Sequence, residues 1–307
     1  ETGAARGMAS SFIACYLFLA GGGAGAFFIA ALVDGVLRFK RTPWLVRVAP
    51  VTDAGLSIGP AAVAVGGVFL LCDLGSPERA LNVFLGPPQS LLGMGAWSIA
   101  IFCFSAIAAL VCGRAAFPLV RRVVEPAFQA IAFACSAFVM VYSGLYLSLF
   151  PAIPFLHTPW IPILFVASAL ATGAGALTVT AFVRQGFEGM LDGIGALSTA
   201  DALLAVVEAV ALAAFCVDAF MAGDAVACSV RSLVTGSFSA LFWIGVVAAG
   251  LVGPLAIDIV SRRVAFAPLI AAGGLLRMTG GLCLRFALLL AAVRYGMVDM
   301  SVQSFWF

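Results

Sequence analysis

Long apolar segments recur along the whole chain, each separated from the next by a short stretch of basic, glycine or proline residues. A helix needs roughly 20 predominantly apolar residues to cross the hydrocarbon core of a bilayer. Charged residues make up only 10% of the 307 residues, whereas soluble domains hold about 25%. The sequence therefore predicts an all-α integral membrane protein with about eight transmembrane helices.

These segments predict one polytopic membrane domain over residues 8–293. The predicted helices cover residues 8–36, 53–74, 91–112, 126–150, 161–183, 195–221, 233–260 and 266–293, and residues 294–307 form a C-terminal tail. The loops after the first, third, fifth and seventh helices hold ten of the sixteen basic residues: Arg38, Lys40, Arg41, Arg47, Arg114, Arg121, Arg122, Arg184, Arg262 and Arg263. Because basic loops tend to stay in the cytoplasm, we expect both termini to face outward.

The most polar outward segment lies between the second and third predicted helices, at residues 72–97. It holds Asp73, Glu78 and Arg79 together with three prolines. Proline and glycine at this density interrupt a helix. The pattern predicts a structured loop rather than a helix that continues through the segment.

Five ionisable residues fall inside predicted membrane helices: Asp201, Glu208, Asp218, Arg277 and Arg285. Charge within a bilayer is costly, so such residues are candidates for a functional role. Asp201 and Glu208 lie on nearly one face of their helix. Counting depth from the helix ends puts Glu208 at a depth similar to that of Arg277, so these two could pair, as could Asp218 and Arg285 nearer the outside. Structural neutralisation between helices and a proton path both stay open as interpretations.

Histidine and cysteine usage limits the cofactors that this protein can hold. His157 is the only histidine, and it falls in a predicted loop, where capping or packing is its simplest role. The eight cysteines show no metal-binding spacing, so we expect neither haem nor an iron–sulfur cluster in this chain. A disulfide between Cys216 and Cys228, which flank an outward loop, stays open.

Two tyrosines, Tyr16 and Tyr142, lie in the outer halves of the first and fourth predicted helices. Each hydroxyl can donate a hydrogen bond to a carbonyl, while the ring offers an aromatic face. Interfacial tyrosines are also common in membrane proteins. Their chemistry alone therefore leaves both ligand binding and membrane anchoring open.

Several motifs resemble one family and occur in the family's order. The first helix contains FLAGGGAGAFF, which is similar to the glycine-rich first helix of the polysulfide reductase membrane-subunit family, the NrfD/PsrC-like anchors. The second loop contains DLGSPER and the third helix opens with GAW (Gly95–Trp97), as in that family. The later segments YSGLYLS, HTPWIPILFVASALATGAG and GGLCLRFALLLA resemble its fourth, fifth and last helices.

The resemblance implies a haem-free anchor of eight helices, arranged as two four-helix bundles, with a menaquinone or ubiquinone site near the outer face. A tyrosine of the family's fourth helix falls on Tyr142, and a polar residue of its first helix falls on Tyr16. By hypothesis we add Gly22, Gly144 and His157 to this quinone site.

The resemblance also implies partners. Anchors of this kind dock a ferredoxin-like subunit with four iron–sulfur clusters, usually beside a molybdopterin-type or other catalytic subunit. We expect Asp73, Glu78 and Arg79 to form part of the docking face, because they lie in the most polar outward loop.

These observations favour a quinone-reactive membrane subunit of a respiratory oxidoreductase, rather than a complete enzyme, in a bacterial or archaeal cytoplasmic membrane. A secondary transporter with an intramembrane Asp/Glu/Arg pathway is the alternative from another class. Transporters often contain internal repeats, and the sequence shows no clear repeat. A purely structural anchor is the third interpretation.

Overall fold

The computed structural model describes residues 2–39, 43–73, 90–149, 153–189, 194–261, 263 and 266–292. Within these ranges the secondary structure is helical, without a strand. Eight helical spans in the described residues are long and apolar enough to cross a membrane: Ser11–Arg38, Val51–Cys72, Gly93–Gly113, Val120–Ser148, Trp160–Arg184, Thr199–Met221, Leu241–Ser261 and Ala267–Ala291. The predicted all-α integral membrane protein is confirmed.

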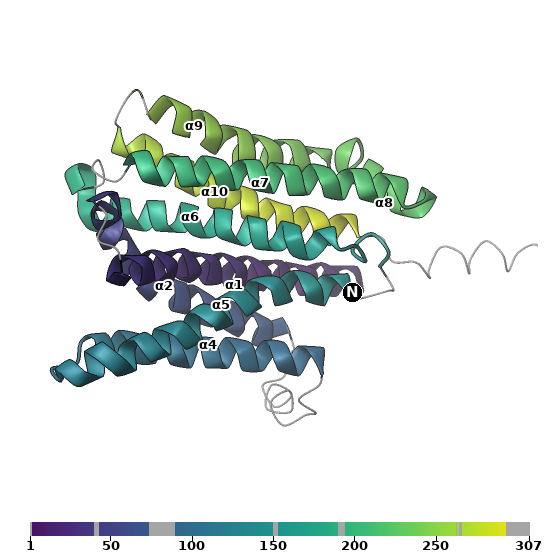
Figure 1. Ribbon diagram of the computed structural model, residues 1–307. Coiled ribbons are helices and arrows are strands. Elements are labelled where there is room, and N and C mark those ends of the chain that lie inside the picture. Colours follow the sequence, from purple (N-terminus) through teal and green to yellow (C-terminus); the bar gives the residue numbers. More distant parts are fainter. Residues whose placement is uncertain are drawn as a thin grey trace, which may run out of the picture.

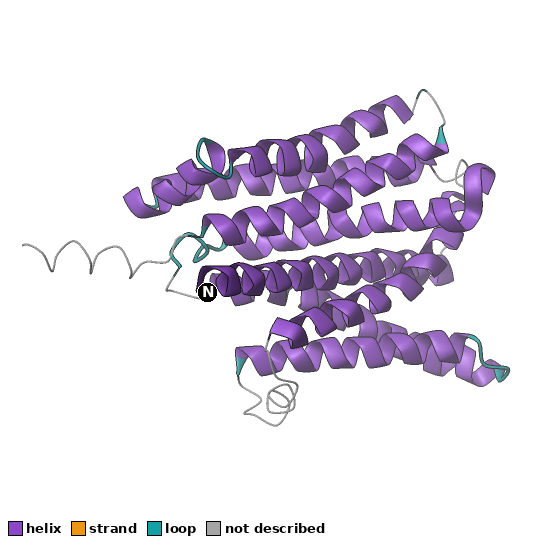
Figure 2. Cartoon of the chain, turned by 180° about the vertical axis from the view of Figure 1, so that it is seen from behind, coloured by secondary structure: helices purple, strands orange, loops and turns teal. Residues whose placement is uncertain are grey.

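The helices lie side by side (Figures 1 and 2), and in chain order we divide the eight spans into two groups of four. The first group contains α1 (Thr2–Phe39), α2 (Pro43–Asp73), α4 (Leu91–Gly113) and α5 (Glu125–Ser148). The second contains α6 (Trp160–Gly189), α7 (Ile194–Met221), the continuous pair η3 (Leu241–Val252) and α9 (Gly253–Ser261), and α10 (Ala267–Ala291). The groups meet where α6 packs against α1, α2 and α5, and where α10 packs against α1.

Two features near the helix ends differ from the sequence prediction. A separate short helix, α8 (Asp224–Val234), precedes the seventh span, which begins at Leu241 rather than at residue 233. The apolar end of α8 merges with the following span in hydropathy, so the sequence did not separate them. The fourth span begins with a π-helical turn, η1 (Val120–Val124). Cys216 and Cys228 are free thiols, so the disulfide is not formed.

Small residues set how closely α1 approaches its neighbours. A side chain at Gly23 would place its Cβ 2.8 Å from the carbonyl oxygen of Gly59 on α2. On the other face of α1, a Cβ at Gly25 would collide with the backbone of Ala169 on α6. Small residues allow such close helix crossings in membranes, where packing drives association. The glycine run of the first helix therefore serves helix packing.

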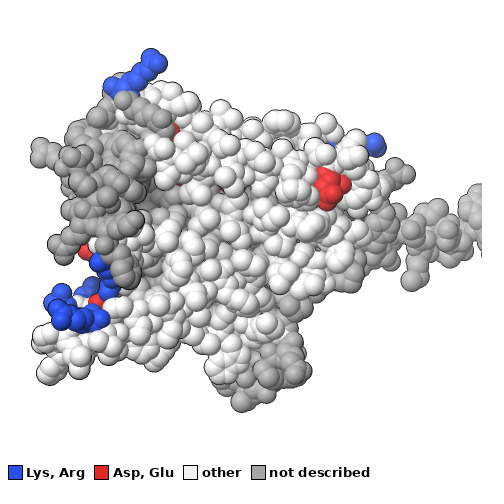
Figure 3. Space-filling model, in the orientation of Figure 1, with Lys and Arg blue, Asp and Glu red and all other residues white. Residues whose placement is uncertain are grey.

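Charged residues gather at the two ends of the bundle, and the visible face between them is largely uncharged (Figure 3). One end, at the turn between α4 and α5, carries Arg114, Arg121 and Arg122, with Arg38 of α1 close by; we call it the basic end. The N-terminus of α1 and helix α8 lie at the opposite end (Figure 1). The predicted tail at 294–307 lies outside the described residues.

Candidate functional site

A cluster of three tyrosines lies toward the opposite end, where α1 meets α5. Tyr16 of α1 and Tyr142 of α5 are each only 6% exposed. Tyr146, one turn further along α5, has its ring centroid 5.9 Å from that of Tyr142. The phenol groups of all three lie close enough to interact electrostatically. The structure thus brings together the two tyrosines that the sequence singled out, and adds Tyr146; we call these three the tyrosine cluster.

The ring of Tyr142 is held against the backbone of α4. It lies over Gly95, where even a Cβ would collide with the ring, and its other neighbours include Phe138, stacked at a centroid distance of 6.0 Å. Gly95 opens the GAW motif, which the sequence analysis noted only as a resemblance. Gly95 contacts the ring of Tyr142 only because α4 packs against α5.

The other residues assigned to the quinone site by hypothesis lie in helix contacts or at a helix end. A Cβ at Gly22 would lie 2.9 Å from the Thr172 side chain, and one at Gly144 would lie 2.5 Å from Cα of Pro162. Helix α6 therefore fills the space beside Gly144 that we expected a quinone ring to use. His157 is exposed, and its Nδ1 lies 2.7 Å from the carbonyl oxygen of Ser148 at the end of α5.

Arg285 of α10 is only 1% exposed and reaches the part of α1 that carries Tyr16. Its Nε donates a hydrogen bond to the carbonyl of Leu17 at 3.1 Å, the residue that follows Tyr16. One terminal nitrogen donates to Ser168 Oγ at 3.0 Å and to the carbonyl of Gly281 at 2.6 Å. This single side chain therefore connects α10, α6 and the stretch of α1 that carries Tyr16.

Arg277, two turns earlier on α10, is also 1% exposed and lies between two carboxylates. Its Nε is 3.1 Å from Asp201 Oδ2 on α7, and a terminal nitrogen is 3.6 Å from Asp258 Oδ2 on α9. The sequence analysis did not select Asp258, although an acidic residue four positions before Arg262 in an apolar helix was a visible signal.

The ion pairs recorded for Arg277 are therefore with Asp201 and Asp258, and not with Glu208 as the sequence had suggested. Glu208 lies near Ser168 and within the electrostatic reach of both arginines. Asp218 is half-buried, and among the described residues no ion pair is recorded for it. Counting depth from the helix ends did not predict this pairing, because it does not show that Arg277 of α10 reaches Asp201 of α7.

Together these groups form a buried polar series along the second helix group. Asp258, Asp201 and Arg277 lie nearer the basic end, and Glu208 lies about 10 Å further along α7 at 1.5 Å per residue. Arg285 follows about 12 Å beyond Arg277 on α10 and binds the carbonyl of Leu17, next to Tyr16 in the chain. The series therefore extends through much of the membrane interior.

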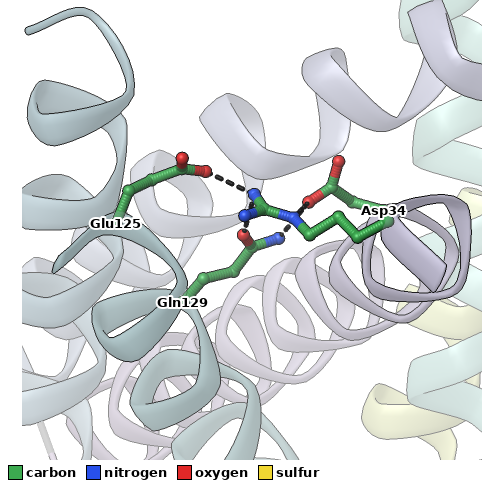
Figure 4. A network of polar contacts seen from close by, with 4 residues as sticks. Asp34, Glu125 and Gln129 are labelled. Atoms are coloured by element: carbon green, nitrogen blue, oxygen red, sulfur yellow. Dashed lines mark hydrogen bonds and ion pairs between the residues drawn. The ribbon is translucent and has the colours of Figure 1, made fainter. Parts of the chain in front are cut away.

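A second polar network joins α1 to α5 at the basic end (Figure 4). Arg38 Nε lies 2.9 Å from Asp34, and a terminal nitrogen binds both Glu125 and, at 2.8 Å, Gln129. Gln129 in turn donates to Asp34 at 2.9 Å. The sequence analysis used Arg38 only in its count of loop charges, although Asp34 lies four residues earlier and so on the same helical face.

The side chains of the three residues proposed for partner docking lie outside what the structure describes. Glu78 and Arg79 lie outside the described residues, and so does the side chain of Asp73 at the end of α2. Among the residues that the structure describes, no group of three or more His, Cys, Asp or Glu side chains is arranged to hold a metal ion.

The fold and these networks define a multi-pass α-helical membrane protein with buried tyrosines near one end and paired charges in its interior. The sequence model of the polysulphide reductase NrfD family matches residues 9–295. The chain therefore belongs to the polysulphide reductase NrfD family.

Three curated relatives are similar over most of their length. The C subunit of the polysulfide reductase of Wolinella succinogenes is 26% identical over 80% of this chain and 81% of its own. The NrfD homolog of Haemophilus influenzae is 24% identical over 91% of this chain and 92% of its own length. NrfD of Escherichia coli is 26% identical over 91% of this chain and 93% of its own length. Eight spans and bacterial relatives identify a multi-pass protein of the bacterial inner membrane, and an electron-transport role fits the family.

Proposed function

We propose that this chain is the quinone-reactive membrane anchor of a respiratory oxidoreductase complex. It binds menaquinone or ubiquinone at Tyr16 and Tyr142 and exchanges electrons with an iron–sulfur partner subunit. Membership of the NrfD family supports the role of a membrane anchor in a redox complex. The tyrosine cluster is the observation that supports the quinone site.

The chemistry of the cluster suits a quinone headgroup. A quinone carbonyl accepts hydrogen bonds, and a phenol hydroxyl donates one while its ring packs against an aromatic ligand. Tyr16 and Tyr142 present two such hydroxyls from different helices in an apolar setting. The bound quinone supplies the two-electron chemistry, whereas the protein's own residues bind and orient it and exclude water.

Arg285 is a positioning residue in this proposal. Its hydrogen bonds to Leu17, Ser168 and Gly281 fix the backbone of α1 next to Tyr16. A rigid backbone at this point keeps the Tyr16 hydroxyl aimed at the site, which matters because binding groups must hold their geometry within a fraction of an ångström.

Quinone chemistry exchanges protons as well as electrons, and the buried polar series provides candidate groups for their transfer. We propose Asp201, Glu208, Arg277 and Arg285 for this path, with Asp218 nearer the opposite end. Asp258 joins them because it shares Arg277 with Asp201. Ionisable groups at membrane depth mark such relays in many membrane proteins.

Partner docking is proposed at the opposite end, through the loop that holds Asp73, Glu78 and Arg79. The basic residues at the other end favour a cytoplasmic position there, which places both termini and the tyrosine cluster on the outward side. The relative from Wolinella succinogenes is named as one subunit of a polysulfide reductase. By analogy we infer a ferredoxin-like partner with four clusters and a molybdopterin-type or other catalytic subunit.

The variant Tyr142→Phe tests the quinone site in the assembled complex. It keeps the ring over Gly95 and removes one hydroxyl, and a lost hydrogen bond of about 0.5–1.5 kcal/mol corresponds to a roughly 2- to 10-fold weaker apparent quinone affinity. The matched control is Trp243→Phe, which removes one aromatic donor, bonded to the Val234 carbonyl, in the other helix group. Unchanged quinone kinetics in assembled Tyr142→Phe would contradict the proposed site.

A further inference from the structure

A polar cavity of about 1050 Å³ opens at the basic end of the first helix group. Five arginines line it, from α1, the α4–α5 turn and α6: Arg38, Arg114, Arg121, Arg122 and Arg184. The acidic residues in its wall are Asp34, Asp53 and Glu125. None of these residues belongs to the tyrosine cluster or to the buried polar series, so the cavity requires a separate explanation.

The cavity carries a surplus of positive charge. Arg38 engages both Asp34 and Glu125 (Figure 4), so the ion pairs recorded for these two carboxylates do not involve the other four arginines. Five arginines and three carboxylates give the described lining residues a net charge of +2. Arg121 and Arg122 are exposed, and no ion pair is recorded for either within the described part of the chain.

An apolar groove of about 700 Å³ adjoins this cavity along α1 and α5. Its walls include Leu32, Val36, Pro126, Ala130 and Phe133. At Gly35 a Cβ would meet nothing within 4 Å, so the groove is open to the lipid side. Arg38 and Gln129 line both the cavity and the groove, and therefore form the boundary between a cationic and an apolar compartment.

We propose that this site binds one anionic phospholipid, with its phosphate against Arg121 and Arg122 and an acyl chain in the groove between α1 and α5. Guanidinium groups bind phosphate oxygens in bidentate fashion, and basic pockets between transmembrane helices bind anionic lipid headgroups. The adjoining groove favours a lipid over a soluble anion, because an acyl chain can be buried against its apolar wall and inorganic phosphate has no apolar part to bury there. The site does not depend on the proposed quinone function.

The test uses the assembled complex, purified in detergent and depleted of lipid. Phosphatidylglycerol added in mixed micelles is expected to raise the thermal unfolding temperature, whereas phosphatidylcholine is not. In R121Q/R122Q the concentration of phosphatidylglycerol needed for half of this effect should rise at least about tenfold, because charge-assisted hydrogen bonds are lost. The matched control is Arg231→Gln on α8 at the opposite end, which should respond as the native protein does.

Two further arms decide what occupies the site. Gly35→Phe fills the groove and leaves Arg121 and Arg122 unchanged, and should weaken the response to phosphatidylglycerol even if R121Q/R122Q fails to assemble. Inorganic phosphate alone should give no stabilisation at millimolar concentration. An unchanged lipid response in R121Q/R122Q or in Gly35→Phe, or equal stabilisation by inorganic phosphate, would overturn the proposal.

Discussion

Arg277 and Arg285 are both fully buried on α10, but different groups stabilise their positive charges. Arg277 is neutralised by the carboxylates of Asp201 and Asp258, whereas Arg285 is held mainly by backbone carbonyls and Ser168, with Glu208 nearby. A buried ion pair adds little net stability, but removing one partner leaves an uncompensated buried charge. The two arginines should therefore respond differently to mutation.

The variant Arg277→Met tests this at the paired site. It leaves Asp201 and Asp258 buried without their cation, at an expected cost of about 3–5 kcal/mol. Thermal unfolding of the purified protein in detergent would show a lower transition temperature. The triple variant R277M/D201N/D258N should recover part of the loss, and Arg263→Met at an exposed turn should have little effect. Equal stability of Arg277→Met and Arg263→Met would contradict the buried network.

The contact between Gly95 and Tyr142 gives a second prediction at the residue scale. The Cβ of an alanine at position 95 would collide with the ring of Tyr142 and displace that ring. We expect Gly95→Ala to weaken apparent quinone affinity at least as much as Tyr142→Phe, with assembly retained. The control is Gly67→Ala, whose Cβ would make an ordinary contact with Ile99 at 4.0 Å. Steady-state quinone kinetics of both variants provide the comparison, and equal affinities would exclude this role for Gly95.

At the scale of elements, α1 and α6 act as the joint between the two helix groups. Gly25 of α1 and Gly173 of α6 lie at their crossing, where a Cβ on either would collide with the facing backbone. Backbone cannot move aside as a flexible side chain does. The glycine-rich pattern of the first helix is therefore explained by two simultaneous close packings, against α2 and against α6.

Paired glycine-to-alanine variants test this joint. Gly173→Ala should destabilise the protein by about 1–3 kcal/mol, because overpacking forces the two helices apart. Gly35→Ala is the control, because Gly35 lies on the transmembrane helix α1 and a Cβ there would face open space. It should leave the stability of the protein unchanged or raise it by up to about 1 kcal/mol, since alanine favours a helix more than glycine does. Denaturation in detergent measures both. A stability loss in Gly35→Ala as large as that in Gly173→Ala would indicate general intolerance to alanine rather than a specific crossing.

At the scale of the whole molecule, the distribution of charge sets an expectation for orientation. Arginines concentrate at the end with the α4–α5 turn, and the tyrosine cluster lies toward the other end. The positive-inside tendency favours the basic end in the cytoplasm. In that orientation, the proposed quinone site lies nearer the outward face, where the partner subunit is also proposed to dock.

Thiol labelling tests the orientation. A variant that keeps only Cys228, an exposed thiol on α8, should react with a membrane-impermeant maleimide in intact spheroplasts. A cysteine-free variant with Arg114→Cys at the opposite end should react only after the membrane is permeabilised. The reverse labelling pattern would invert the topology and place the tyrosine cluster toward the cytoplasm.

The sequence by itself determined the number of membrane spans and the all-α class, because the thickness of the hydrocarbon core fixes how long an apolar helix must be. Together with the family resemblance, it also selected Tyr16 and Tyr142. Hydropathy depends on which residues a helix contains, and not on how the helix is rotated or shifted against its neighbours. Only the tertiary structure decided those rotations and shifts.

Three residues show the difference. Asp258 joined the Arg277 site because α9 turns it toward α10, and Gly144 faces α6 rather than a ligand space. The ring of Tyr142 rests on Gly95 because α4 and α5 pack with one particular register. Each successive residue turns about 100° around a helix, so an error of one position in the packing changes which side chains meet. Such contacts are fixed by the fit of whole helices, which no single segment of sequence contains.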